Sequence, residues 1–185
     1  GILKGQELIA NAKISSTVGQ LKGLDAAFNT FQDKYSAVPG DMTNPTQRLP
    51  DCNAAPCNVA GNGNSRIDGT GIAAAPTAGS ENATSFIHLS AADLVSGIDY
   101  TGNTIAFGQV LPSVRAGGGL WVAYANAAVN GTGVNIGRHY AVLNGTVGAP
   151  GAATGALSPT TAAQIDRKLD DGRSDTGSFS AVGTG

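Results

Sequence analysis

The chain has 185 residues, about the size of one ordinary domain and enough to bury a hydrophobic core. Charged residues make up 13% of it, the formal net charge is −2, and 27 residues are glycine. This charge balance excludes a basic nucleic-acid-binding protein of the usual kind, because no excess of cations is present to neutralise phosphates. The glycine content argues against a helical bundle throughout and favours a loop-rich protein with much β-structure.

Residues 1–36 carry the clearest pattern, a single apolar stripe with three-, four- and seven-residue spacing. The stripe predicts one long helix, which Pro39 and Gly40 bring to an end. At about 1.5 Å per residue the helix would be about 50 Å long, more than one small domain covers. We therefore expect its second half to pack on a core and residues 1–14 to find little to pack against. The residues singled out in that first part are Ile2, Leu3, Gly5, Ile9 and Ile14.

Residues 37–80 contain many turn-forming residues and no periodic segment, which predicts a long irregular excursion. The only two cysteines lie here, Cys52 and Cys57, with four residues including a proline between them. A zinc site would need two further ligands, and both histidines are far away in sequence. We therefore predict a local disulfide, which points to an oxidising compartment.

Helical spacing returns over 80–97, with Ser80 as the predicted N-cap and Gly97 as the predicted end. Three short apolar runs between residues 100 and 148 then predict strands: 104–107, 120–124 and 140–143. Ser158 and Pro159 predict the start of a last helix that ends at residues 170–172, and residues 179–182 predict a terminal strand. The chain therefore has the helices and strands of an α+β protein.

Groups that could carry catalysis are sparse. Neither histidine has a nearby acid and nucleophile of the kind that a hydrolase triad needs. We expect His88, at the edge of a helical apolar face, to have a structural role, and we expect no enzyme activity. The rival hypothesis is an enzyme with a shallow polar site around His88 and Glu81.

A run of glycines and oxygen-bearing side chains from Gly61 to Gly69 resembles a calcium loop, with Asn62, Asn64 and Asp68 as candidate ligands. Only one of the three is a carboxylate, so affinity would be poor unless Asp41 or Glu81 joined them. An ordinary cluster of turns is the favoured interpretation. The second candidate set is Asp170, Asp171 and Asp175, for which neighbouring basic side chains are the favoured partners. We expect no cofactor and a weak or absent effect of calcium.

Four segments, in this order, resemble the type IV pilin-like proteins of the prepilin class. The first is the helix up to Tyr35, and the second is Tyr35-Ser-Ala-Val-Pro-Gly-Asp-Met42. The third runs from Gly61-Asn-Gly-Asn to the segment from Glu81 to Phe86-Ile-His-Leu89. The fourth and most specific is Gln164-Ile-Asp-Arg-Lys-Leu-Asp-Asp-Gly172, followed by Thr176-Gly177. The family's Phe-Thr-Leu-x-Glu segment and the apolar span behind it do not occur in this sequence, so we expect a longer native protein.

This resemblance implies a pilin-like α+β fold in which a long N-terminal helix packs on an antiparallel sheet, with extra short helices and a long αβ loop. Residues 1–36 would be the C-terminal part of the pilin helix, and residues 37–185 the globular head. The implied function is that of a structural subunit of a type IV pilus-like extracellular filament. Its partners would be copies of itself or other pilins, and inner-membrane assembly machinery. The implied location is the bacterial cell surface, with the head in the periplasm or outside the cell.

Two alternatives remain open beside the enzyme. The chain is a minor pilin or pseudopilin of a type II secretion or DNA-uptake system, or it is an extracellular adhesion domain unrelated to pilins. In relatives from secretion systems calcium binds near C-terminal loops, which keeps the acidic set at Asp170 as a candidate. No direct binding of nucleic acid by the head is expected.

Overall fold

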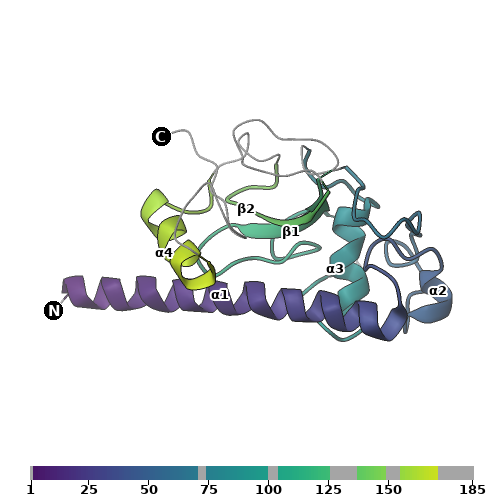
Figure 1. The fold of residues 1–185 in the computed structure, drawn as a ribbon, viewed down its shortest axis with the longest axis horizontal. Helices are drawn as coiled ribbons and strands as arrows, with labels where there is room; N and C mark the ends of the chain where they lie inside the picture. Colours follow the sequence, from purple (N-terminus) through teal and green to yellow (C-terminus); the bar gives the residue numbers. More distant parts are fainter. Residues whose placement is uncertain (1, 71–73, 100–103, 126–136, 149–154, 171–185) are drawn as a thin grey trace.

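The structure is a computed structural model that describes residues 2–70, 74–99, 104–125, 137–148 and 155–170. Its elements are α1 (Ile2–Tyr35), α2 (Pro45–Arg48), α3 (Glu81–Ala91), β1 (Gly119–Tyr124), β2 (His139–Asn144) and α4 (Pro159–Leu169). Figure 1 shows α1 as one long rod with the other elements along one side of it. The arrangement of a long N-terminal helix on a small antiparallel sheet confirms the predicted α+β fold class.

The main core forms where α1, α3 and β1 meet. The second half of α1 buries Phe31 completely, and Phe28 packs edge-on against Phe86 of α3 with ring centroids 6.4 Å apart. On the other side α3 contacts β1, whose Trp121 is fully buried. The indole nitrogen of Trp121 has no hydrogen-bond partner in the part of the chain that the structure describes. This three-element core is the frame on which the rest of the molecule is built.

The sheet has two antiparallel strands, with Trp121 opposite Val142. Strand β1 is buried along both faces, as expected for an apolar run between helix and loop layers, whereas β2 has exposed positions. The first of the three predicted strands, 104–107, is wrong. Phe107 makes only an isolated bridge to Leu111, because Gly108 adopts a φ of +81° and turns the chain back on itself.

The end of α3 also differs from the prediction, because the helix stops at Ala91 and not at Gly97. Asp93 takes the left-handed conformation with φ +59°, and the N–H of Leu94 donates to the carbonyl of Leu89. The N–H of Asp93 donates to Ser90 in the same turn. This is the bonding of a Schellman cap, in which an aspartate fills the position that glycine usually takes.

The last helix begins as the sequence predicts. Ser158 is its N-cap, and its hydroxyl accepts the Thr161 N–H at 3.2 Å. The helix lies across α1 and buries Ile165 against Ile14 and Val18, in a small cluster apart from the main core. Ile14 is thus only 2% exposed, which corrects, for this residue, the expectation that residues 1–14 have little to pack against in their own chain. The predicted strand at 179–182 lies outside the described residues.

We predict that Ile165→Ala lowers the free energy of unfolding by about 2–4 kcal/mol, because Ile165 is completely buried and the truncation leaves a cavity. The matched control is Ile9→Ala, the same truncation at a side chain that is 60% exposed. It should change stability by less than about 0.5 kcal/mol. Urea unfolding followed by circular dichroism measures both, and equal losses would contradict the packing of α4 on α1.

Candidate functional site

The first turns of α1 project beyond α4, at the N-terminal end of the rod in Figure 1. From Lys4 to Lys13 every residue is exposed except Gly5, which is partly exposed; we call this stretch the exposed segment. A Cβ atom added at Gly5 would meet nothing within 4 Å. The side chains of Ile2 and Leu3 lie outside the described ones. The structure therefore leaves Gly5 and Ile9 uncovered, as the sequence predicts, and takes Ile14 out of that set.

Two large apolar side chains stand out on this segment. Leu8 is 70% exposed and Ile9 is 60% exposed, and they are the only large hydrophobic residues with such exposure in the part of the chain that the structure describes. Consecutive helical residues point about 100° apart, so the two side chains make more than one face of the segment apolar. Sequence reasoning missed Leu8 because it lies off the main stripe, although its adjacency to Ile9 was a usable signal.

None of the helices in the described ranges combines the length and the apolar character that crossing a membrane requires.

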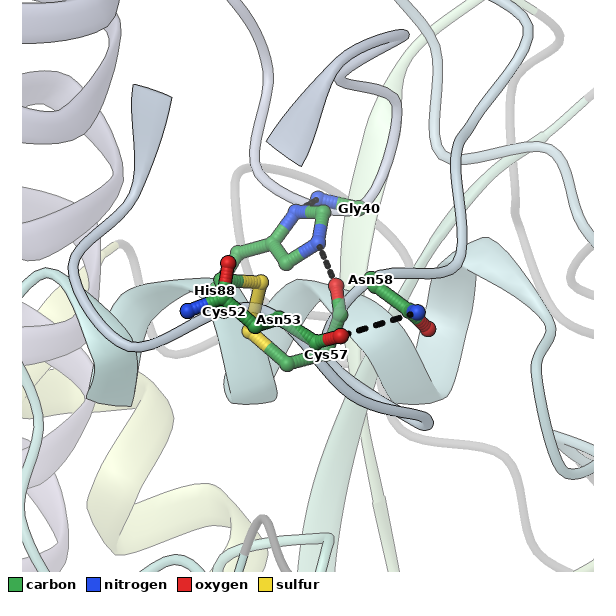
Figure 2. Close-up of a disulfide and its surroundings, with 6 residues drawn as sticks. All are labelled: Gly40, Cys52, Asn53, Cys57, Asn58 and His88. Carbon is green, nitrogen blue, oxygen red and sulfur yellow. Dashed lines mark hydrogen bonds between the residues drawn. A yellow bond between two sulfur atoms is a disulfide. The ribbon is translucent and has the colours of Figure 1, made fainter. Parts of the chain in front are cut away.

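A second constellation lies at the opposite end of α1, around the disulfide. Cys52 and Cys57 are bonded, with their Cα atoms 5.1 Å apart, which confirms the predicted pair. His88 is completely buried beside it, as Figure 2 shows. Its Nδ1 accepts the N–H of Gly40 at 3.0 Å, and its Nε2 donates to the carbonyl of Cys57 at 3.0 Å. Both ring nitrogens are thus occupied by backbone groups, which confirms a structural role for His88.

The pKa of His88 is lowered to about 4, because burial disfavours the charged imidazolium. The hydrogen bond to the Cys57 carbonyl acts in the opposite direction but is the smaller effect. His88 is therefore a neutral imidazole at physiological pH, with its proton on Nε2.

Gly40 allows the chain after α1 to pass close to α3, which brings these groups together. Its φ is +90°, and a Cβ atom there would collide with the carbonyl oxygen of Glu81. The chain between α1 and the disulfide can approach α3 this closely only with glycine at this position. Gly40, in the Pro-Gly-Asp sequence after α1, is therefore required for the contact between the turn and α3.

Asp41, directly after Gly40, is buried and binds the backbone of the candidate calcium loop through its carboxylate. It is 3% exposed, and its Oδ1 accepts the N–H groups of Gly63 at 2.6 Å and Asn64 at 3.3 Å. Its Oδ2 accepts the N–H of Ser65 at 2.5 Å. Both carboxylate oxygens are thus used by the backbone, a role that residue type and spacing did not reveal.

Glu81, at the start of α3, holds the two ends of the same loop. Its Oε1 accepts the N–H of Asn62 at 3.2 Å, and its Oε2 accepts those of Asp68 at 3.0 Å and Gly69 at 3.3 Å. Burial and the hydrogen bond with the Asp68 carboxyl group raise the pKa of Glu81 to about 6. Burial also opposes ionisation of Asp68, but hydrogen bonds from Asn64, Glu81 and Asn62 together lower its pKa.

The three candidate calcium ligands come together in space, but their oxygens are turned to other partners. The Asn62 Oδ1 accepts the N–H of Asn64, and the Asn64 Oδ1 accepts the N–H of Arg66. The side-chain nitrogens of both asparagines donate to the Asp68 carboxylate, at 3.4 and 2.8 Å. This arrangement fits a cluster of Asx turns better than a calcium cage.

The described ranges contain no group of three or more acidic, histidine or cysteine side chains placed to hold a metal ion. In the second candidate set, Asp170 is exposed at the end of α4, while Asp171 and Asp175 lie outside the described residues. The expectation of a weak or absent calcium effect stays a prediction.

The far end of the loop is fastened to the sheet. Ile67 is fully buried, and its N–H donates to Nε2 of His139 at 3.1 Å. Its carbonyl accepts the N–H of Tyr124 at 2.7 Å, and the Arg66 guanidinium lies 4.8 Å from the centre of the Tyr124 ring. The exposed tip of the loop is therefore held in place from both sides.

Comparison with known proteins gives no match: no family model fits the chain, and neither the curated proteins nor the solved structures include a significant relative.

We predict that Asp41→Asn destabilises the protein by about 1.5–3 kcal/mol, the range for hydrogen bonds to charged groups, because three N–H donors face this buried carboxylate. Asp51→Asn is the control, since Asp51 is exposed and asparagine tolerates its positive φ. Urea midpoints of the two variants give the comparison. Similar midpoints would show that Asp41 does not organise the loop.

We predict that millimolar calcium raises the melting temperature by no more than magnesium does, because the oxygens of Asn62 and Asn64 already accept backbone N–H groups. Differential scanning calorimetry with each salt tests this. A calcium-specific rise of many degrees that disappears in Asp68→Asn would place a real site in this loop. A rise that persists in that variant would point instead to the acidic set around Asp170.

Proposed function

We propose that this chain is a structural subunit of a type IV pilus-like extracellular filament, which assembles through its N-terminal helix and exposes its globular head. The observation that carries the proposal is the exposure of Leu8 and Ile9 on a helical segment that extends past its own head. The resemblance of the four segments to pilin-like proteins is the reason for proposing a pilus-like filament as the kind of assembly.

The energetics favour a covered segment. Burial of a Leu or Ile side chain is worth about 1.5–3 kcal/mol relative to leaving it in water. In the isolated chain Leu8 and Ile9 remain in water, so this favourable free energy of burial is not obtained. Contiguous exposed apolar side chains are typical of interaction surfaces. Contact of the exposed segment with copies of the same helix would bury both faces at once, and Gly5 would allow close approach of the backbones.

The head suits an outward position in such a filament. The loop from Asn62 to Arg66 is exposed along its whole length, yet it is fixed by hydrogen bonds to Asp41 and Glu81. A fixed, polar loop presents the same surface to the surroundings in every subunit. The proposed location is the bacterial cell surface, with the inner membrane and its assembly machinery as the site of the unassembled protein. The disulfide fits an oxidising compartment.

The test replaces both apolar side chains by glutamine, which keeps helix propensity and removes the apolar surface. In cells that produce the natural gene product, Leu8→Gln with Ile9→Gln should abolish or strongly reduce filaments seen by electron microscopy. The control is Lys22→Gln with Asn29→Gln, two exposed positions of α1 beside the head, and it should leave filaments intact.

Thermal unfolding of the purified chains must show that both double variants keep a folded head. Wild-type filament numbers from the Leu8 and Ile9 variant would contradict the proposal. Short complexes or tip structures in place of long fibres would favour the minor pilin or pseudopilin alternative.

A further inference from the structure

Both histidines of the sequence fasten the same stretch of chain to the rest of the molecule. His88, on α3, accepts the N–H of Gly40, and His139, on β2, accepts the N–H of Ile67. Gly40 and Ile67 lie near the two ends of residues 37–70, the irregular stretch between α1 and α3, which we call the flap. The two acceptor distances are 3.0 and 3.1 Å.

We propose that the two histidines make the flap an acid-releasable unit, which opens on protonation while α1, α3 and β1 keep their mutual packing. The chemical reason is the direction of the two hydrogen bonds. In each case an unprotonated ring nitrogen receives a backbone donor. A protonated imidazole carries N–H groups on both nitrogens, so the donor of Gly40 or Ile67 would then face another donor.

Protonation of His88 would be the more disruptive event. Its ring is completely buried, Phe31 stacks parallel to it at 6.5 Å, and its other nitrogen already donates to the Cys57 carbonyl. Figure 2 shows the ring between the Gly40 turn and the disulfide loop. A cation there would have no acceptor on the Gly40 side, and relief would require the turn to move away from α3.

The pKa shifts of both histidines have the direction that opening of the flap in acid requires. Burial lowers the pKa of His88 to about 4, and burial also lowers the pKa of His139, against the opposing charge of Asp41. An open flap would return His88 to its ordinary value of 6.5. The neutral ring therefore favours the closed flap fully above about pH 6.5, and this advantage is lost as the pH falls towards 4.

Other ionisable groups lie on the elements packed around the two histidines. The charge of Asp41 acts on His139, whose ring centre lies 5.2 Å from that of Tyr124, and Arg66 lies over the Tyr124 ring. On α1, Tyr35 contacts Phe31, which stacks on His88, and Lys34 lies over the Tyr35 ring. Asp68 of the flap interacts with Glu81 of α3. Glu81 acts in the opposite direction to the histidines, because its raised pKa means that its protonation favours the closed form. The histidine effect must therefore exceed that of Glu81 for the flap to open.

The frame has contacts that do not depend on the flap. Phe28 meets Phe86 directly, α3 contacts both α1 and β1, and the Asn82 side-chain nitrogen donates to the Val122 carbonyl at 2.9 Å. The flap also buries Met42, Leu49 and Ile67 in the same core, so these side chains have to leave it when the flap opens. Because the contacts named above join the frame elements directly, acid should separate the flap from the frame before it separates these elements from one another.

The test is hydrogen exchange read by mass spectrometry on the unaltered chain at pH 7 and at about pH 4.5, corrected for the intrinsic pH dependence of exchange. Between these conditions, linkage through His88 alone raises the opening constant by roughly 50-fold and linkage through Glu81 lowers it by roughly 15-fold, which leaves a net rise of roughly 4-fold. Peptides from 37–57 should lose protection by this order, and peptides from α1 beyond Ile14, α3 and β1 should not. Loss of protection in flap and frame together would overturn the proposal.

Titration of the imidazoles by NMR gives a second readout that needs no variant, since only two histidines have to be assigned. Both should titrate below 6.5 in the folded protein, and a His88 value at or above 6.5 would also overturn the proposal. His139→Gln assigns the signals and acts as the matched control. It should reduce the acid response around Ile67 and leave that around Gly40 unchanged.

Discussion

The fold depends on hydrogen-bond acceptors for the backbone N–H groups of the long stretch between α1 and α3, which belongs to no sheet. Residues 37–70 contain one helix of four residues and no strand. Their N–H groups still need partners where they are buried. Asp41, Glu81 and Asn82 supply side-chain oxygens, and His88 and His139 supply ring nitrogens. Except for Asp41, these side chains come from α3 or β2. Regular elements therefore hold the irregular segment in a defined conformation.

Helix α1 lies in three environments along its length. Its last turns form the main core with Phe31 and Tyr35, its middle is covered by α4 at Ile14 and Val18, and its first turns stand free. Because the covered part is anchored by α3 and α4, the free part needs no packing of its own to remain attached in a defined direction. This division would allow one helix to belong both to the head and to the assembly contact that we propose.

Predictions from the sequence were most accurate where a structural feature depends on residues that are close together in the chain. The length of α1, the Ser158 cap and the disulfide each follow from residue types within a few positions, and all three are confirmed. The end of α3 was mispredicted because Asp93 takes the left-handed position that the prediction placed at Gly97. The burial of Ile14 was missed because it depends on Ile165, which is distant in sequence.

The same distinction applies to the loop at residues 61–69. Sequence spacing correctly brought Asn62, Asn64 and Asp68 together, since they are neighbours in the chain. It did not show that their amide oxygens would accept backbone N–H groups, or that the Asp41 and Glu81 carboxylates would be used by that backbone. Those outcomes depend on Gly40, whose positive φ brings the turn against α3.

The position of Trp121 has a spectroscopic consequence. It is the only tryptophan of the chain, it is fully buried in β1, and its indole nitrogen has no hydrogen-bond partner in the described ranges. An indole in such apolar surroundings emits at short wavelength and is shielded from quenchers in the solvent. Its fluorescence therefore reports on the frame of α1, α3 and β1. A disturbance of this frame could thus be followed by tryptophan emission without any introduced label.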